Sequence, residues 1–535
     1  MTQPDHGASR TDRHPSFRWK RAAFLNIAGL AGILAIFQLV PDQTFRVMYL
    51  YYWIAACFVL ACFWWLGFSG VSRNTRIATA LGVAVVVMAA IAGSVRRIEF
   101  DGAMVPRFEW RWQPSAEIER AKWFRRQQNR SETDLLLDVP HQVRSTDWPR
   151  YCGSHGSRMI LEPLTVRDWK QHPPQELWRH PIGEGWSSFA IVGSRAFTQE
   201  QRGPLECVVC YHADTGAELW SHADETRYET AMAGIGPRAT PTLTDSAVFA
   251  LGATGILNCL DPVTGETVWQ RNICDDAGTS TPEWGFSGSP LIVDETIIID
   301  AGGSGDKAVI AYHQDTGDIV WAAGNHRAGY ASPRLEKIRG QTVLLVFHGD
   351  GLLAMSPSDG SRFWEYPFTN MYQVNAAQPM MTGDHVFIST GYDGGCVALD
   401  PGRISDARPA EVWPPNRDLK LKFNEAVALD GFVYGLDDGI LCCVNAATGR
   451  REWKGGRYRF GHVLLWDDVL LVQSEAGYTA LVEATPEAFR EITRFSALSQ
   501  PTGGSPVKVW NVPVVNRSRL YVRSAREAAC FELPR

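Results

Sequence analysis

The sequence predicts an all-β fold, an eight-bladed β-propeller, preceded by three transmembrane α-helices. One observation is a sequence motif that recurs about every 45 residues in the C-terminal part. The motif, which we call the phrase, consists of a strand, a turn that contains Gly, and a second strand that carries Trp. Short apolar strands and Pro-marked openings between the copies bring each repeat to four strands, which is typical of a propeller blade. The other observation is a set of three apolar runs near the N-terminus, each close to the ~20 residues that a bilayer span requires.

The N-terminal part predicts a multi-pass membrane anchor. Residues 1–21 form a polar, basic tail, and the segment 22–97 contains the three spans, at 22–40, 47–68 and 77–95. Tyr49, Trp53 and Trp64 lie near the ends of the second run, as interfacial aromatic residues do. These features make membrane lipid an expected partner. The alternative is three buried helices of a globular domain.

The distribution of Lys and Arg predicts the orientation of the anchor. Three spans place the two ends of the chain on opposite sides of the membrane. Basic residues near the membrane are more numerous on the N-terminal side, which favours a cytoplasmic N-terminus. We therefore expect a location in the inner (cytoplasmic) membrane, with the propeller periplasmic or otherwise extracytoplasmic.

Residues 98–163 are expected to be a connector. Phe108, Trp110 and Trp112 alternate with Arg107 and Arg111, a pattern typical of a strand or of a segment at the lipid headgroups. A helix is predicted over 114–129, with several basic side chains on it. Two interpretations stay open: contact with anionic lipid, or a solvated linker helix.

Residues 164–535 are predicted to form the propeller. Pro residues mark several of the blade openings, from Thr240-Pro241 to Ser505-Pro506, and the strand 528–533 has no outer strand after it. The strand of Trp178 has no hairpin before it, so pairing these two would close the ring. The eight blades are marked by Trp178, Trp220, Trp269, Trp321, Trp364, Trp413, Trp453 and Ile492.

Composition limits the function. Charged residues make up 21% of the chain and the pI is near 6.1, so nucleic acid is not an expected partner. The eleven cysteines show no zinc-site spacing. Cys207 and Cys210 lie in a predicted strand, where residues three apart point to opposite faces, which favours buried thiols over chelation or redox cycling.

The repeated phrase resembles the tryptophan-docking repeat of the pyrroloquinoline-quinone (PQQ)-like propellers. This family includes quinoprotein alcohol dehydrogenases and the propeller lipoprotein that helps insert outer-membrane barrels. Asp147-Trp-Pro-Arg-Tyr-Cys-Gly153, Gly285-Phe-Ser-Gly-Ser-Pro290 and Leu481-Val-Glu-Ala-Thr-Pro486 resemble membrane-anchored, planctomycete-type members. The resemblance covers 147–535 and implies the fold more specifically than any activity.

For the enzyme branch of the family, the resemblance implies PQQ with calcium in the channel, clamped by a disulfide between adjacent cysteines. Cys442-Cys443 is such a pair, but it lies inside a predicted strand, where neighbours point to opposite faces. No acidic and amide set indicates a calcium site, and no Cys-x-x-Cys-His indicates haem. We therefore expect a membrane-anchored binding or scaffolding module for envelope proteins or ligands. The alternative is a PQQ-dependent oxidoreductase.

Residues in or just before the blade openings are the candidate binding residues at the channel mouth. They are Glu184, Ser188, Arg238, Trp284, Ser287, Tyr330, Asn375, Asn424 and His462. One interpretation is that they bond one another and trapped water. The other is a pocket with a lone cation, Arg238, and a proton carrier, His462. No catalytic residue is predicted, because Ser187 and Ser188 lack the GxSxG elbow of a hydrolase.

Arg238 is the sharpest of these candidates. A guanidinium in a narrow channel needs an anionic or carbonyl partner. The internal partners expected from the sequence are Glu184 and Glu425, and the alternative partner is an outside ligand.

Overall fold

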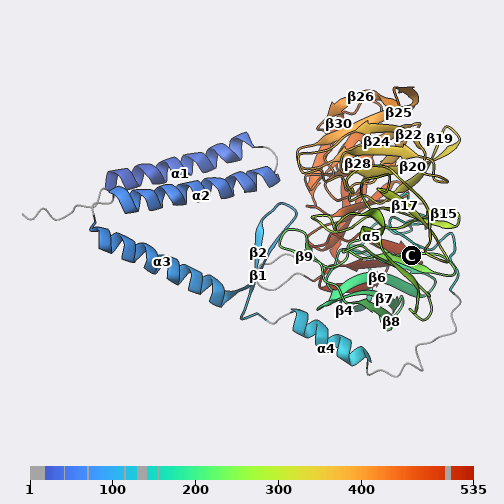
Figure 1. Cartoon of the computed structure of the whole chain (residues 1–535), viewed down its shortest axis with the longest axis horizontal. Coiled ribbons are helices and arrows are strands. Elements are labelled where there is room, and N and C mark those ends of the chain that lie inside the picture. The colour runs from blue at the N-terminus through green and yellow to red at the C-terminus, as the bar shows by residue number, and fades with distance from the viewer. Residues whose placement is uncertain are drawn as a thin grey trace, which may run out of the picture. The chain divides into compact units, whose positions relative to one another are not determined.

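The computed structural model describes residues 19–40, 43–68, 71–113, 116–128, 141–154, 156–499 and 508–535. It divides into two compact units. One comprises 1–98 with 103–113, and the other comprises 99–102 with 114–535. Figure 1 shows helices in the first unit and the strands of the propeller in the second.

Three α-helices make up most of the first unit: α1 (Trp19–Leu39), α2 (Gln43–Phe68) and α3 (Arg73–Ser94). The hydroxyl of Ser72 accepts the N–H of Thr75 and caps the start of α3. α2 and α3 are long and apolar enough to cross a membrane, whereas the apolar stretch described in α1, Asn26–Leu39, is shorter than a span. Of the three predicted spans, two thus meet this criterion within the described residues.

The connector contains a two-stranded sheet of β1 (Val95–Phe100) and β2 (Pro106–Trp110), followed by α4 (Ala116–Gln128). The pattern around Phe108 and Trp110 allowed a strand or a segment at the lipid headgroups, and the structure has a strand there. The helix predicted over 114–129 is confirmed over 116–128. The helix is not wholly solvated, because Arg120 is 6% exposed and lies 3.4 Å from the carboxylate of Glu184. The ring of Trp123 also stacks on His180 at 4.6 Å.

Eight sheets form the propeller, which confirms the predicted all-β, eight-bladed fold (Figure 1). The first three blades, each in sheet order, are β5 (Ala190–Val192), β6 (Arg195–Arg202), β7 (Leu205–His212) and β8 (Glu218–Asp224); β11 (Thr242–Leu243), β12 (Val248–Leu251), β13 (Ile256–Leu260) and β14 (Thr267–Asn272); and β15 (Leu291–Val293), β16 (Thr296–Asp300), β17 (Val309–His313) and β18 (Ile319–Ala323). The next three are β19 (Arg334–Ile338), β20 (Gln341–His348), β21 (Gly351–Met355) and β22 (Arg362–Pro367); β23 (Met380–Thr382), β24 (His385–Thr390), β25 (Gly395–Ser405) and β26 (Arg408–Asn416); and β27 (Val427–Leu429), β28 (Phe432–Asp437), β29 (Ile440–Asn445) and β30 (Arg451–Arg457). The last two are β31 (His462–Trp466), β32 (Val469–Gln473), β33 (Tyr478–Glu483) and β34 (Glu491–Ser496); and β35 (Val514–Asn516), β36 (Arg519–Arg523), β37 (Glu527–Glu532) and β4 (Gln175–Pro181).

Four short elements lie outside this plan. β3 (Met159–Ile160) adds a parallel fifth strand beside β31, so the segment before the propeller joins one of its blades. β9 (Glu229–Thr230) and β10 (Gly234–Ile235) form a hairpin ahead of β11. α5 (Ile273–Ala277) follows β14.

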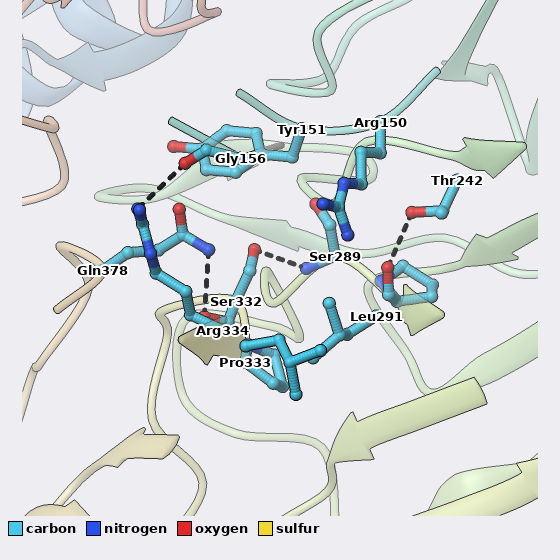
Figure 2. Close-up of a pocket in the computed structure, with 12 residues that line it drawn as sticks. Arg150, Tyr151, Gly156, Thr242, Ser289, Leu291, Ser332, Pro333, Arg334 and Gln378 are labelled. Carbon is cyan, nitrogen blue, oxygen red and sulfur yellow. Dashed lines mark hydrogen bonds between the residues drawn. The ribbon is translucent and has the colours of Figure 1, made fainter. Parts of the chain in front are cut away.

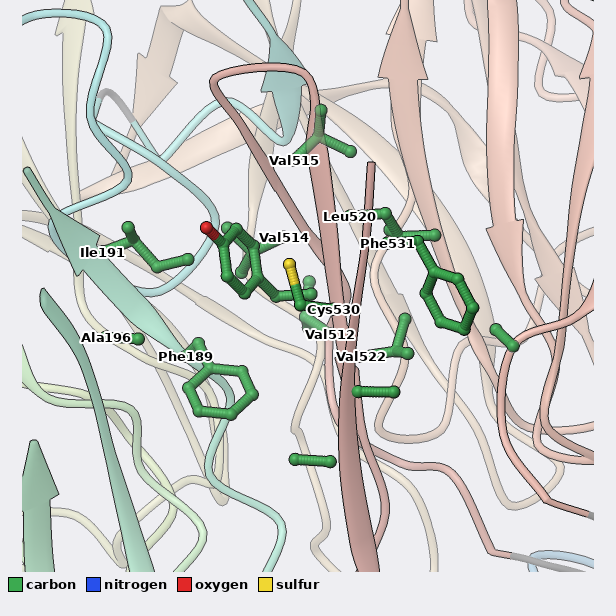
Figure 3. Packing of buried hydrophobic residues seen from close by; sticks show 14 of the residues in the cluster. Phe189, Ile191, Ala196, Val512, Val514, Val515, Leu520, Val522, Cys530 and Phe531 are labelled. Carbon is green, nitrogen blue, oxygen red and sulfur yellow. The ribbon is translucent and has the colours of Figure 1, made fainter. Parts of the chain in front are cut away.

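The ring closes through strands from both ends of the propeller segment. β37 pairs antiparallel with β4, so that Ala528 lies opposite His180 and Cys530 opposite Trp178. This pairing confirms the predicted closure. Figure 3 shows the adjoining core, in which Phe189 of the neighbouring blade packs near Val514 and Val522 of the closing blade.

The Trp and Gly of the repeat contact each other across neighbouring blades. The indole of Trp269 donates to the carbonyl of Gln314 at 2.7 Å. A Cβ on Gly317 would lie 2.8 Å from that ring, and Gly317 has a φ of +72°, so the turn requires Gly both for its backbone angle and for space. The same contact joins Trp178 with Gly216, Trp220 with Gly265, Trp321 with Gly360, and Trp413 with Gly449.

The repeat also explains several cysteines. Across the strand pair from each Trp lies a small residue, which leaves room for the ring. It is Ala in blades such as that of Ala311 and Trp321. It is Cys in four blades, as Cys210, Cys259, Cys443 and Cys530. All eleven cysteines are free. Cys207 and Cys210 belong to different core clusters, as their predicted opposite faces require.

One repeat differs from its prediction in detail. The sequence suggests a stretched turn between Pro401 and Pro409. In the structure the two strands continue instead, with Ile404 opposite Pro409 and Ser405 opposite Arg408. The inserted residues therefore lengthen a hairpin, because they can continue the backbone pairing of β25 and β26.

Candidate functional site

Ser and Thr side chains just before the first strands link neighbouring blades. Each hydroxyl oxygen accepts a hydrogen bond from a backbone N–H of the adjacent blade. The N–H of Val512 donates to Ser188 Oγ at 2.7 Å, and the N–H of Ser188 donates to Thr240 Oγ1 at 3.1 Å. The N–H of Thr240 then donates to Ser289 Oγ at 3.0 Å, and that of Ser289 to Ser332 Oγ at 2.8 Å. The predicted site residue Ser188 is thus buried in a chain of bonds between blades.

A second set of side chains lies just before these strands. We call it the collar: each member precedes the first strand of its blade by four residues. Its members are Trp186, Arg238, Ser287, Tyr330, Phe423 and Trp510. The sequence analysis named Arg238, Ser287 and Tyr330 and missed the other three.

Aromatic contacts link part of the collar. The ring centroids of Trp186 and Trp510 are 4.6 Å apart, and those of Phe423 and Trp510 are 4.8 Å apart. Phe460 extends the series, 5.9 Å from Phe423. Trp510 was missed because the last blade opening was assigned to Ser505-Pro506. That dipeptide lies outside the described residues, and Val512-Pro513 directly precedes β35.

Arg238 is held by backbone carbonyls. It donates to the carbonyl of Gly236, to that of Ala233 at 3.0 Å and to that of Gly234 at 3.4 Å. Its guanidinium carbon lies 4.3 Å from the centre of the Tyr228 ring. Burial lowers the pKa of Arg238 to about 10. Arg238 therefore has carbonyl partners, as one of the predictions held. Through these hydrogen bonds Arg238 anchors the β9–β10 hairpin.

The expected carboxylate partners of Arg238 are wrong. Glu184 forms its ion pair with Arg120. Glu425 lies 2.9 Å from Arg158 and also accepts a hydrogen bond from Tyr151 at 3.2 Å. Arg120 and Arg158 both come from the segment before the propeller. The repeat pattern does not predict where that segment lies.

Arg238 is also not a lone cation. Lys508 lies over the rings of Trp186 and Trp510, at 5.6 and 4.9 Å from their centroids. Lys422, which is 1% exposed, lies 4.2 Å from the centroid of Phe460. Burial lowers the pKa of Lys508. The charge at the mouth is therefore shared among three blades, and it is placed on aromatic faces.

Residues 99–102 contact this region. Glu99 lies 3.6 Å from Lys508. The N–H of Gly102 donates to Glu475 Oε1 at 3.0 Å, and Trp510 donates to the same oxygen at 2.8 Å. Burial raises the pKa of Glu475. An extended acidic segment of the chain thus occupies part of the mouth.

The neighbouring predicted residues Trp284, Ser287 and Tyr330 bond one another. Ser287 Oγ donates to the carbonyl of Tyr330 at 2.8 Å. The Tyr330 phenol is hydrogen-bonded to the backbone of Trp284, and burial raises its pKa to about 12. This group supports the interpretation that the lining residues satisfy one another.

Asn375 and Asn424 are fully buried and support loops. The amide of Asn375 donates to the carbonyls of His348 and Phe368, both at 2.8 Å. Asn424 accepts the N–H of Lys422 at 3.1 Å and donates to the carbonyl of Leu436 at 3.2 Å. Both side chains therefore hold the backbone around the channel.

His462 is buried and bonded to the carbonyl of Trp510 at 2.7 Å through Nε2. Burial lowers its pKa to about 4. It is therefore neutral near pH 7, and its ring is a hydrogen-bond donor to the backbone. This environment does not suit the predicted proton carrier.

The residues present do not fit the clamp that PQQ would need. Cys442 and Cys443 are free and lie in different core clusters, on opposite faces of β29. Burial raises the pKa of both thiols. Among the described residues, no group of three or more His, Cys, Asp or Glu could hold a metal ion. The described residues therefore do not form the cysteine clamp of a PQQ site.

Comparison with known proteins identifies related sequences. The model of the family described as outer membrane protein assembly factor BamB matches residues 175–455. BamB of Burkholderia pseudomallei is 25% identical over 305 residues, which cover 53% of this chain and 70% of that protein. A quinoprotein ethanol dehydrogenase of Pseudomonas putida is 26% identical over 174 residues, 28% of this chain. The match spans only 26% of that enzyme's length.

Solved structures show the same fold at low identity. A europium-containing methanol dehydrogenase has a TM-score of 0.54 at 11% identity and covers 75% of this chain and 99% of its own. A quinohemoprotein alcohol dehydrogenase from Comamonas testosteroni has a TM-score of 0.53 at 12% identity, over 78% and 85% of the two chains. BamB from Moraxella catarrhalis has a TM-score of 0.49 at 15% identity, over 67% and 100%.

Proposed function

Because the chain belongs to the family of the outer membrane protein assembly factor BamB, we propose that it is a membrane-anchored propeller that binds an envelope protein. A family of assembly factors supports a binding or scaffolding role. The apolar helices α2 and α3 support an anchor in the membrane. The weak basic bias of the N-terminal side supports an extracytoplasmic propeller.

One observation on the propeller carries this proposal. Loops that lead into the first strands expose large apolar side chains at the mouth. Met232 is 37% exposed, Met371 is 69% exposed and Tyr372 is 39% exposed. We call these three residues the rim. Exposed Met and Tyr beside polar groups are typical of protein interfaces.

The rim is also held in place, which favours recognition by a preformed surface. Arg238 bonds the carbonyls of Ala233 and Gly234, next to Met232. The Trp186 indole donates to the Ala233 carbonyl as well, at 2.8 Å. Tyr372 packs edge-on against Tyr392 at 5.6 Å. A partner therefore meets side chains whose backbone is already ordered, which lowers the entropic cost of binding.

Site-specific photocrosslinking tests the rim. A crosslinkable residue at Met371 in the full-length protein, in its native membrane, is expected to give a discrete protein adduct. Val268 on β14, 55% exposed on an outer strand, is the matched control and is expected to give none. No adduct at Met371, or the same adduct from both positions, would overturn the proposed interface.

Protease treatment tests the anchor and its orientation. Protease added to intact spheroplasts is expected to digest the propeller, because we place it outside the cytoplasmic membrane. A propeller that is digested only after the membrane is opened would reverse the orientation. A full-length protein that leaves the membrane fraction in carbonate wash would disprove the anchor.

A further inference from the structure

A recess lies against the first strands of neighbouring blades, and Arg150, Tyr151 and Gly156 form one side of it (Figure 2). The recess is small and open on one side. Its walls come from β11, β15 and β19, and Gln378 precedes β23. The segment belongs to the Trp-Pro-Arg phrase of the sequence, to which neither the repeat nor the proposed function assigns a role.

Positive charge exceeds negative charge around this recess. Arg150 and Arg334 line it, and Arg158 lies behind Gln378, to whose amide oxygen it donates at 3.1 Å. Two carboxylates oppose these three guanidinium groups: Glu425 pairs with Arg158, and Glu336 pairs with Arg334.

Among the described residues, Arg150 forms no ion pair with a carboxylate, because Glu425 and Glu336 pair with Arg158 and Arg334. Its Nε donates to the carbonyl of Gly153 at a long 3.4 Å. Burial lowers the pKa of Arg150, and the neighbouring positive charge of Arg334 lowers it further. Figure 2 shows the Arg150 side chain pointing toward Ser289. Arg150 is half-buried, and an anion beside it would offset the repulsion from the neighbouring like charge.

Hydroxyl groups complete the lining. Ser289 Oγ accepts the N–H of Thr240 at 3.0 Å, and Ser332 Oγ accepts that of Ser289 at 2.8 Å. Because each oxygen accepts a backbone proton, each hydroxyl keeps its own proton to donate. A guanidinium fork beside two O–H donors matches the oxygens of a carboxylate or phosphate group.

We propose that this recess, lined by Arg150, Ser289 and Ser332, binds a small anion through its carboxylate or phosphate group. The anion neutralises Arg150 and joins it to Ser289 and Ser332, which lie two residues before the strands β15 and β19 of two neighbouring blades. This binding is independent of the rim and of any protein partner there.

The test is thermal unfolding of the full-length protein in detergent, titrated with sodium phosphate or sodium succinate at constant ionic strength set with chloride. We expect a saturable rise of the unfolding temperature with at least one of the two anions. A response to phosphate alone assigns a phosphate group, and a response to succinate alone assigns a carboxylate. No saturable rise with either anion would overturn the proposal.

Variants locate the effect. Arg150→Gln is expected to weaken anion binding by about ten-fold or more, because it removes charge-assisted hydrogen bonds. Arg150→Lys keeps the charge but loses the fork, so we expect an intermediate affinity; it also serves if Arg150→Gln does not fold. Arg144→Gln changes an exposed Arg of the same segment and is expected to bind like wild type. Equal binding by wild type, Arg150→Gln and Arg150→Lys would place the anion elsewhere and refute the site.

Discussion

Arg158 and Glu425 form an ion pair of 2.9 Å in which the two side chains are only 1% and 3% exposed. Arg158 also donates to the carbonyl of Ala426 at 3.2 Å. It comes from the segment before the propeller, whereas Glu425 lies two residues before β27. The pair thus ties the connector to the centre of the ring.

Breaking this pair is expected to destabilise the propeller strongly. Arg158→Ala leaves a buried carboxylate without its cation, which costs about 3–5 kcal/mol. The measurement is denaturant unfolding of the full-length protein. The matched control is Arg167→Ala, whose pair with Asp468 is exposed and is expected to contribute at most about 1 kcal/mol. Equal losses in the two variants would show that the buried pair has no special role.

The stability of the protein is expected to depend on Glu206 between about pH 4.5 and pH 7. Burial raises the pKa of Glu206 to about 7, against an ordinary value of 4.5. A carboxyl with a raised folded-state pKa favours folding in its protonated form. Its ionisation therefore costs stability as the pH rises from 4.5 to 7, by about 3 kcal/mol in total.

Glu206→Gln tests this dependence. The variant is expected to be more stable than wild type at pH 8, and the advantage is expected to vanish near pH 4.5. Unfolding free energies of both proteins at the two pH values measure it. Glu266→Gln, at an exposed position, is the control and should track wild type. A constant difference between Glu206→Gln and wild type across this range would contradict the assignment.

Contact between Trp and Gly of neighbouring blades predicts unequal effects of two Gly→Ala changes. Gly317 and Gly305 have nearly the same φ, +72° and +70°. Substitution by Ala at either position therefore costs about 1 kcal/mol of stability through backbone strain. Only Gly317 has a ring within 4 Å of its new Cβ. Gly317→Ala is therefore expected to cost about 1–3 kcal/mol more than Gly305→Ala in denaturant unfolding. Equal costs would mean that the ring moves aside freely.

Closure of the ring predicts the effect of a C-terminal truncation. Deleting 528–535 removes the partner of β4 and exposes the edges of two strands. We expect aggregation or loss of a single cooperative unfolding transition, measured by light scattering and thermal denaturation. Deleting only Pro534 and Arg535, which lie beyond β37, is the control and should preserve both properties. A soluble and cooperative 528–535 deletion would rule out this role of the closure.

The number of blades and their closure could be predicted because they depend on local chemistry. A turn such as that at Gly317 needs a positive φ, and a large ring such as Trp269 needs a small residue opposite it, here Cys259. Both requirements act within a few residues of sequence and recur at each blade. The same logic explains why the cysteines are buried thiols.

The contents of the channel could be predicted only in part. Arg238, Ser287 and Tyr330 were found because Pro residues mark their blade openings. Trp510 was missed because Val512-Pro513 was not recognised as an opening. Lys422 and Lys508 were missed because each meets an aromatic ring of another blade, Phe460 and Trp186 respectively, and the sequence does not show that contact.

The sequence by itself determined the all-β architecture, the eight repeats, the closing strand pair and the apolar helices. Only the tertiary structure decided which charges meet. Arg238 received backbone carbonyls instead of Glu184 or Glu425, because Arg120 and Arg158 of the connector occupy those carboxylates. Repeat periodicity specifies contacts between equivalent positions of adjacent blades. It carries no information about a segment that precedes the repeats, and the pairing of buried charges depends on where that segment crosses the ring.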